Sequence, residues 1–236
     1  MKIGIVILSR MDSSRLPGKA LLDIAGKPII GHVLSFCQKV DGIDSIALAT
    51  SNRLVDEPLS EFAKTNGIVC IRGSLDNVAE RFLLAMEALD LDAAVRINGD
   101  SPLNDPALIS EGILRFRKGN FDLVSNVPQR TYPFGMSVEI IGRKAMEYAC
   151  TAMNDERHRE HVTKYFYDHE VKFKISKMVS SDPSFAGVQL AVDTREDLDH
   201  IKWIISQLEC EPADAGIATL VRIAQSSPGS RGPNHG

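Results

Sequence analysis

The sequence has no apolar run that approaches the roughly 20 residues of a membrane-spanning helix. Its four cysteines are scattered and form no C-x-x-C pair, so neither a zinc site nor a disulfide framework is indicated. No G-x-x-x-x-G-K-[ST] phosphate loop is present. A net charge of -4 over 236 residues argues against nonspecific nucleic-acid binding. Arg10 interrupts the first apolar stretch, which we therefore interpret as a strand and not a signal peptide. We expect a cytoplasmic protein with no membrane and no nucleic-acid partner.

Short apolar runs alternate with segments that have helical spacing of apolar residues over the first half of the chain. Strands are predicted at 2–8, 45–49, 69–71, 93–97 and 123–126. Helices are predicted at 29–40, 56–66, 77–89 and 106–118. This alternation indicates an α/β fold with a doubly wound, mostly parallel sheet of Rossmann-like type.

The pattern changes after residue 129. We expect a strand at 137–141, helices at 143–153 and 157–167, and a half-exposed, antiparallel strand at 171–176. A final sheet strand is predicted at 188–192, and helices at 195–208 and 215–224. The whole is expected to be one domain, 1–225, with a small antiparallel excursion at 129–176. Residues 226–236 contain no large apolar side chain and are predicted to be a disordered tail.

The segment RMDSSRLPGK, residues 10–19, follows the first predicted strand. It carries three cations, Arg10, Arg15 and Lys19, and the hydroxyls of Ser13 and Ser14. Loops at the carboxyl ends of strands bind ligands in such folds, and cations with free backbone N–H groups suit a polyphosphate. The alternative is a solvated linker, but the loop is long for a strand-to-helix connection, where about 2–6 residues are usual.

Two aspartates each follow a predicted strand, Asp100 within RINGDSP and Asp193 within VDTRED. If both strands join one sheet, their carboxylates converge beside the cationic loop and could hold Mg²⁺, which takes one or two carboxylates plus phosphates and waters. Taken singly, each has a structural alternative. Asp193 could cap the following helix, with Thr194 sharing that role, and Asp100 could make an Asx turn.

The segment R-x-x-S-S-R-L-P-G-K, followed by G-K-P at 26–28, resembles the signature of the cytidylyltransferases that activate acidic sugars. These include the 3-deoxy-manno-octulosonate (KDO) and acylneuraminate enzymes, and the likeness is greatest to the spore-coat polysaccharide branch typified by SpsF. The resemblance extends to about residue 208. It implies a nucleotide-diphospho-sugar transferase type of fold. It also implies that the G-D-x-P and V-D-T-x-x-D-L segments place Asp100 and Asp193 as magnesium ligands.

The resemblance implies a CTP-dependent transfer of CMP to an acidic sugar of ulosonic-acid type, with release of pyrophosphate, for surface polysaccharide synthesis. Arg10, Arg15 and Lys19 would act on the triphosphate and the leaving pyrophosphate. The expectation that the base of the nucleotide is cytosine rests on the resemblance alone. The nucleotide-binding residues implied are Leu8, Ser9, Arg10, Ser14, Arg15, Lys19, Arg72 and Asn98.

Two further segments resemble the family's acceptor side, T-Y-P-x-G-x-x-V-E at 131–139 and E-H-V-T at 160–163. They imply acceptor-binding roles for Tyr132, Glu139, Arg157 and His161, and contacts in a homodimer. From the residues alone, a charged helix face with a pair such as Arg157 and Glu160 is an equal alternative.

Two positions depart from the family pattern. Ser101 stands where the KDO enzymes carry an acidic residue, which fits the spore-coat branch. Asp12 stands where a small residue is usual, and its carboxylate should repel a triphosphate unless it points away or meets a cation. The alternatives to a cytidylyltransferase are a sugar-1-phosphate nucleotidylyltransferase, whose G-x-G-x-R loop is absent, a glycosyltransferase, which would show D-x-D, and a non-catalytic nucleotide-binding protein.

Overall fold

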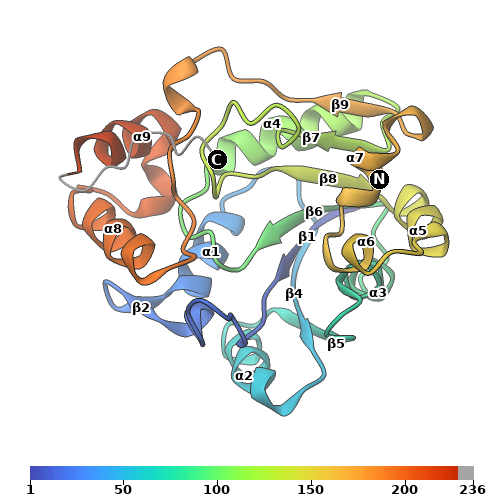
Figure 1. Cartoon of the computed structure of the whole chain (residues 1–236), viewed down its shortest axis with the longest axis horizontal. Coiled ribbons are helices and arrows are strands. Elements are labelled where there is room, and N and C mark those ends of the chain that lie inside the picture. Colours follow the sequence, from blue (N-terminus) through green and yellow to red (C-terminus); the bar gives the residue numbers. More distant parts are fainter. Residues whose placement is uncertain (228–236) are drawn as a thin grey trace.

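A computed structural model of the chain describes residues 1–227, and it has one central sheet of seven strands. The strand order is β5 (Val69–Gly73), β4 (Ser45–Ser51), β1 (Ile3–Leu8), β6 (Ala93–Asn98), β8 (Glu139–Gly142), β7 (Leu123–Ser125) and β9 (Ile175–Lys177). Only β8 within this sheet runs antiparallel to its neighbours. The predicted doubly wound, mostly parallel α/β fold is confirmed (Figure 1).

The strand order reverses beside β1. The chain runs outward from β1 to β4 and β5, then returns to place β6 on the other side of β1. At such a reversal the loops leave neighbouring strands in opposite directions, which opens a crevice at the carboxyl ends of the strands. The loop after β1 and the residues after β6 flank this crevice.

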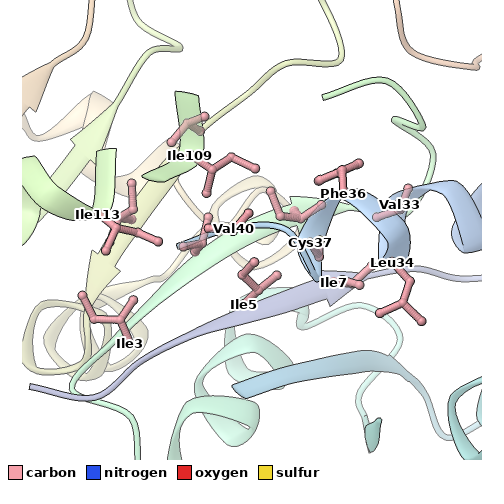
Figure 2. Close-up of a cluster of buried hydrophobic side chains, with 14 of the residues drawn as sticks. Ile3, Ile5, Ile7, Val33, Leu34, Phe36, Cys37, Val40, Ile109 and Ile113 are labelled. Carbon is pink, nitrogen blue, oxygen red and sulfur yellow. The ribbon is translucent and has the colours of Figure 1, made fainter. Parts of the chain in front are cut away.

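Helices cover both faces of the sheet because the central strands are buried on both sides. One face is covered by α1 (Ile29–Cys37), α2 (Glu57–Thr65) and α4 (Pro106–Lys118), and the other by α3 (Val78–Ala88) and α5 (Arg143–Ala152). Alternate residues of β1 serve the two faces. Ile3, Ile5 and Ile7 pack with α1 and α4 (Figure 2), whereas Val6 and Leu8 pack with α3.

A third apolar cluster lies outside these two layers. It packs α8 (Arg195–Ser206) and α9 (Gly216–Ser226) against the hairpin of β2 (Asp23–Ile24) and β3 (Lys27–Pro28), and it includes Leu190 and Val192. This cluster brings the carboxyl-terminal part of the chain beside the loop that follows β1. Among the described helices, none is long and apolar enough to cross a membrane.

The second half of the chain corrects three predictions. The expected helix at 157–167 is two short helices, α6 (Glu156–Glu160) and α7 (Lys164–Asp168), because the backbone leaves helical geometry at His161 and buries Val162 completely. The expected antiparallel strand at 171–176 begins as a 3-10 turn, with Val171 exposed, and continues as β9, which is parallel to β7.

The expected sheet strand at 188–192 is also wrong. The segment makes only an isolated bridge between Gln189 and Phe134. Its apolar side chains Leu190 and Val192 enter the third cluster and do not pack against the sheet, so a short apolar run was not sufficient evidence for a strand. Of the predicted tail at 226–236, Ser226 ends α9, and residues 228–236 lie outside the described part of the chain.

Candidate active site at the carboxyl edge of the sheet

The loop after β1 folds back on itself before it enters the short 3-10 helix η1 (Lys19–Leu21). The amide of Gly18 donates to the carbonyl of Met11 at 2.8 Å, and Gly18 has φ +69°, a conformation that glycine adopts without strain. The amide of Met11 donates to the fully buried carboxylate of Asp56 at 2.6 Å. These contacts fix both ends of the loop, so Lys19 begins η1 in a defined position.

Lys19 lies between the two predicted metal ligands. Its Nζ is 2.7 Å from Oδ2 of Asp100 and 3.1 Å from Oδ1 of Asp193, and the Lys19 side chain is only 12% exposed. Nζ also donates to the carbonyl of Val192 at 2.9 Å. Arg15 places Nη2 3.0 Å from the same oxygen of Asp193. The structure thus places these four charged residues together.

Asp193 reaches this position without a sheet strand. The amide of Val192 donates to the carbonyl of Asp100 at 3.0 Å, which ties the two segments together directly before Asp193. Thr194, not Asp193, is the N-cap of α8, where it forms a reciprocal capping box with Asp197. The carboxylate of Asp193 is thus left for Lys19 and Arg15, and the capping alternative for this residue is wrong.

The two aspartates form a donor set that fits Mg²⁺. Both present a carboxylate oxygen to one shared cation, the Lys19 ammonium. Among residues 1–227 no group of three or more His, Cys, Asp or Glu side chains is placed to hold a metal ion. A two-carboxylate site suits magnesium, which usually completes its coordination shell with phosphate oxygens and waters.

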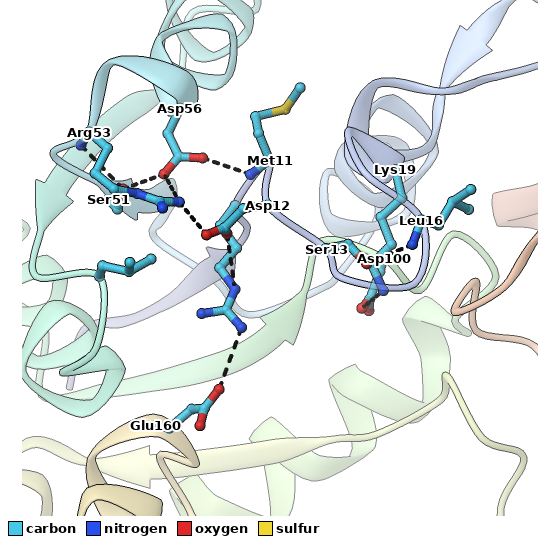
Figure 3. Close-up of polar contacts among 12 residues, drawn as sticks. Met11, Asp12, Ser13, Leu16, Lys19, Ser51, Arg53, Asp56, Asp100 and Glu160 are labelled. Atoms are coloured by element: carbon cyan, nitrogen blue, oxygen red, sulfur yellow. Dashed lines mark hydrogen bonds and ion pairs between the residues drawn. The ribbon is translucent and has the colours of Figure 1, made fainter.

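Asp12 belongs to a row of alternating charges that crosses the site (Figure 3). Arg53 places Nη2 2.6 Å from one oxygen of Asp12, and Nε of Arg10 is 3.5 Å from the other. Arg10 in turn reaches Glu160 of α6 at 3.4 Å. Asp12 therefore meets two cations, Arg10 from its own loop and Arg53 from the segment after β4, which is the condition under which the sequence analysis expects no repulsion of a triphosphate.

A cavity of about 360 Å³ opens over the loop and brings most of the predicted nucleotide residues together. Arg72 does not line it. Its guanidinium is bound to Glu57 and to the carbonyls of Ser51 and Arg53, at the end of β4. Val78 and Arg81 of α3 line the cavity and were not predicted. The predicted residues that line it are Leu8, Ser9, Arg10, Ser14, Arg15, Lys19, Asn98, Asp100 and Asp193.

A second cavity of about 470 Å³ lies on the other side of the two aspartates and includes Glu139 and His161. The other two predicted acceptor residues do not line it. Tyr132 packs against the core cluster of α1 and α4. Arg157 is exposed and bound to Asp155, 2.6 Å away, and this contact lowers the pKa of Asp155 to about 2. The alternative pair of Arg157 with Glu160 is not formed, because Glu160 binds Arg10.

Glu139 is buried in a network that the sequence analysis missed. One of its oxygens is 2.5 Å from Nη1 of Arg96, and the other accepts from the hydroxyl of Tyr167 at 2.6 Å. Burial and the Glu139 charge together raise the pKa of Tyr167 well above its ordinary value, so this phenol stays protonated as a donor. The sequence did contain a signal for this network. Arg96 is a charged residue inside the otherwise apolar strand 93–97, so a buried partner for it could have been expected.

Gly135 supports the chain segment that carries Asp193. It has φ +96°, and a Cβ there would lie 2.7 Å from backbone atoms of Leu190 and Ala191. We expect Gly135→Ala to lower the free energy of unfolding by about 2 kcal/mol and to weaken nucleotide binding, because the 188–193 segment must move away. Gly26→Ala is the matched control, since φ is +81° but nothing lies within 4 Å. Equal losses in chemical denaturation would contradict this view.

Comparison with known proteins identifies the class of this site. The chain belongs to the cytidylyltransferase family, whose model matches residues 4–225, and these proteins are nucleotidyltransferase enzymes. It is 27% identical over 236 residues to the spore coat polysaccharide biosynthesis protein SpsF of Bacillus subtilis, with 94% of each chain covered.

Two more relatives support the same class. The chain is 34% identical over 125 residues to 3-deoxy-manno-octulosonate cytidylyltransferase 2 of Hydrogenovibrio crunogenus, which covers 52% of this chain and 50% of that protein. The solved structure of a cytidylyltransferase from Leptospira borgpetersenii superimposes with a TM-score of 0.90 and 28% identity, covering 95% of this chain and 94% of that one. The family resemblance predicted from the loop motif is confirmed.

Proposed function

We propose that this protein uses CTP to couple CMP to an acidic sugar of ulosonic-acid type, with release of pyrophosphate, in the synthesis of a surface polysaccharide. The observation that carries the proposal is the placement of Lys19 between Asp100 and Asp193. These two carboxylates lie where the two cavities meet, and both cavities include them. Such a junction is where a nucleotide and an acceptor could react.

The loop cations suit the triphosphate half of CTP. Arg15 and Lys19 line the smaller cavity beside the aspartates, and Arg10 lies on the same loop. In the transfer, a hydroxyl oxygen of the acceptor bonds to the α-phosphorus while the bond from that phosphorus to the bridging oxygen breaks. Pyrophosphate leaves with the bond electrons, and the hydroxyl proton passes to solvent. Lys19, Arg15 and Arg10 would orient the phosphates and stabilise the charge on the leaving group.

Asp100 and Asp193 would hold the divalent cation, which we propose to be Mg²⁺. When bound, the cation supplies charge stabilisation for the phosphates. The ammonium of Lys19 now occupies the space between the carboxylates, so a phosphate chain that draws Lys19 toward itself also frees both carboxylates for the metal. The site is therefore suited to bind nucleotide and metal together.

The larger cavity suits an acidic acceptor. Arg130 lines it, stands over the ring of Phe134 at 5.3 Å, and forms no ion pair with any described residue. Its backbone has φ +45°, which is uncommon for a residue with a side chain and is often found at ligand sites. By contrast, Arg96 is already paired with Glu139 and Lys164 with Asp168. Arg130 is thus the cation best placed to bind the carboxylate of a sugar acid.

The names of the relatives support the same substrate class. One acts in spore coat polysaccharide biosynthesis, and others are 3-deoxy-manno-octulosonate cytidylyltransferases. The family resemblance also supports a homodimer, which light scattering on the purified protein would test.

Calorimetric titration with CTP, UTP, ATP and GTP, with and without magnesium, tests the proposal first. We expect selective binding of CTP that strengthens with magnesium, followed by pyrophosphate release when an acidic sugar is added. Preference for another nucleotide would overturn the cytidylyl assignment. Failure to bind any of the four would indicate a non-catalytic protein.

A further inference from the structure

Five residues of the described chain line both cavities, and four of them are among the site residues predicted from the sequence. These four are Asn98, Asp100, His161 and Asp193, and the fifth is Arg96 of β6. In the proposed reaction, transfer takes place where the nucleotide cavity meets the acceptor cavity. A side chain that lines both cavities therefore lies beside the reacting groups, and Arg96 has no role there so far.

Arg96 is held in place by Glu139. The two residues face each other across β6 and β8, and Nη1 of Arg96 is 2.5 Å from Oε2 of Glu139. The other oxygen of Glu139 accepts from the hydroxyl of Tyr167 at 2.6 Å, and this hydroxyl lies 2.7 Å from Oγ of Ser125. Both oxygens of Glu139 are engaged, and the residue is only 1% exposed. Glu139 therefore orients Arg96 and offers little surface to an acceptor.

Part of the Arg96 guanidinium is left for a ligand. Its contact with Glu139 uses Nη1, whereas Nη2 makes no hydrogen bond or ion pair with any residue of the described chain. Nε is buried and has no hydrogen-bond partner among residues 1–227. The Arg96 side chain is 18% exposed, so a ligand in the cavities can reach it. A guanidinium that is only partly bound can donate to a further oxygen, and most strongly to a charged one.

Arg96 reaches the junction of the cavities from the opposite face of the sheet to Lys19. In the register of β1 and β6, Arg96 stands beside Val6, whose side chain packs with α3. Lys19 begins η1, which packs with α1 on the other face, where Ala20 enters the core cluster of α1 and α4. A phosphate at the junction would therefore meet a cation on each side.

We propose that Arg96 is a further catalytic residue, which donates to a non-bridging oxygen of the α-phosphate, and that Glu139 and Tyr167 are its positioning residues. This inference rests on the proposed function. As the acceptor oxygen bonds to the α-phosphorus and the bond to the bridging oxygen breaks, negative charge is spread over the non-bridging oxygens. A donor that is fixed before the reaction stabilises this charge.

The chemistry of arginine limits the other roles that Arg96 could have at this junction. Its guanidinium has no acceptor atom and stays protonated, so Arg96 cannot be the base that takes the proton of the acceptor hydroxyl. Glu139, which the family resemblance placed in the acceptor site, acts through Arg96 and does not touch the acceptor itself.

Phosphorus NMR of the complex with CTP and magnesium tests the contact without any acceptor. The double variant Arg96→Met/Glu139→Gln removes both charges together, because a buried carboxylate left without its partner is strongly destabilising. We expect its α-phosphorus resonance to move from the wild-type position by more than the β and γ resonances do. Tyr167→Phe should move the α resonance in the same direction by a smaller amount, since it loosens Arg96 without removing it.

Turnover with 3-deoxy-manno-octulosonate as the acidic sugar measures the catalytic effect. We expect the double variant to lower kcat about 10²-fold and to change KM for CTP less than about threefold, because the contact strengthens as charge builds in the transition state. Adding Tyr167→Phe to the double variant should lower kcat no further, since nothing is left to position. A merely structural tyrosine would add a loss of its own.

Arg143→Met/Glu147→Gln is the matched control. Arg143 and Glu147 form an ion pair of 3.7 Å on α5 and line neither cavity. This variant should leave kcat and all three phosphorus resonances unchanged. Thermal unfolding without ligand shows whether each variant folds. Arg96→Lys serves if the double variant does not, because a single ammonium held by Glu139 cannot also reach the phosphate.

The outcomes separate the possible roles of Arg96. An unchanged α resonance in a variant that binds CTP would overturn the proposal, and so would equal movement of all three resonances, which indicates a general disturbance of the site. A shifted α resonance with wild-type kcat would make Arg96 a binding residue only, which also overturns it. If the wild-type protein binds no nucleotide, the proposed function fails and this inference falls with it. If it binds CTP and the Arg96 variants behave as wild type, only this inference fails.

Discussion

Replacement of Lys19 by methionine is expected to lower the rate of CTP-dependent pyrophosphate release at least about 10³-fold, with the fold intact. Lys19 is the one described cation that contacts both Asp100 and Asp193, and its ammonium is positioned by three oxygens within 3.1 Å. Methionine keeps the apolar length of the side chain and removes the charge. The turnover number is measured at saturating CTP and acceptor, and circular dichroism checks the fold.

Lys39→Met is the control for this change, because Lys39 forms an exposed pair with Asp214 and lines neither cavity. It should retain full turnover. A Lys19→Met protein with normal turnover would rule out the whole site assignment, since no other residue in the described chain bridges the two carboxylates.

The same variant has an expected effect on stability. Without the ammonium, two partly buried carboxylates face each other, and we expect the free energy of unfolding to fall by about 1–2 kcal/mol. Magnesium alone should restore much of this loss in the variant, and should have little effect on the wild-type protein without nucleotide. Thermal unfolding with and without magnesium measures the difference. A variant that magnesium does not stabilise would contradict a metal site at Asp100 and Asp193.

Asp100→Asn is expected to lower turnover by about 10²–10³-fold and to weaken the dependence on magnesium. The substitution keeps the size of the side chain but removes the charge that a cation requires. Asp193→Asn should behave similarly, and the double variant should be little worse than either one, because residues that act as a unit are not additive. Turnover is measured over a magnesium titration.

Asp199→Asn controls for a change of charge on α8, since the one ion pair that Asp199 forms within residues 1–227 is an exposed pair with Arg195. It should not alter the magnesium titration. An Asp100→Asn protein with unchanged magnesium dependence would place the metal elsewhere.

The first half of the fold could be predicted because its signals are local. Buried parallel strands read as short apolar runs, and α4 begins and ends at the predicted residues 106 and 118, where Pro106 and the N-cap Asp105 mark the start. The loop and the aspartates could be predicted because their residue types report their chemistry. The later segments could not, because distant contacts decide their conformation. Val188–Val192 resembles a strand in sequence but is held by Phe134 and Asp100.

Site residues were missed for a related reason. Arg81 lies within a helix whose apolar residues indicate core packing, and nothing in its spacing shows that a charged side chain there is buried. Arg72 lies near the carboxyl end of β5, on the correct edge of the sheet, yet β5 lies two strands from β1, and Glu57 binds the guanidinium. Sequence order gives the sheet edge for each residue, whereas the strand order in space decides which residues meet.

The hydrogen bond from Val192 to Asp100 has a consequence for how the enzyme is made. During synthesis the loop after β1 and Asp100 leave the ribosome long before Asp193, and amino-terminal segments fold first. A growing chain can therefore complete β1, β4, β5 and β6 while Lys19 has only one of its two carboxylate partners. On the proposed function, the complete set of charged groups for a nucleotide and its metal would therefore assemble only when α8 docks. The last part of the chain to be made would then decide when the site becomes complete.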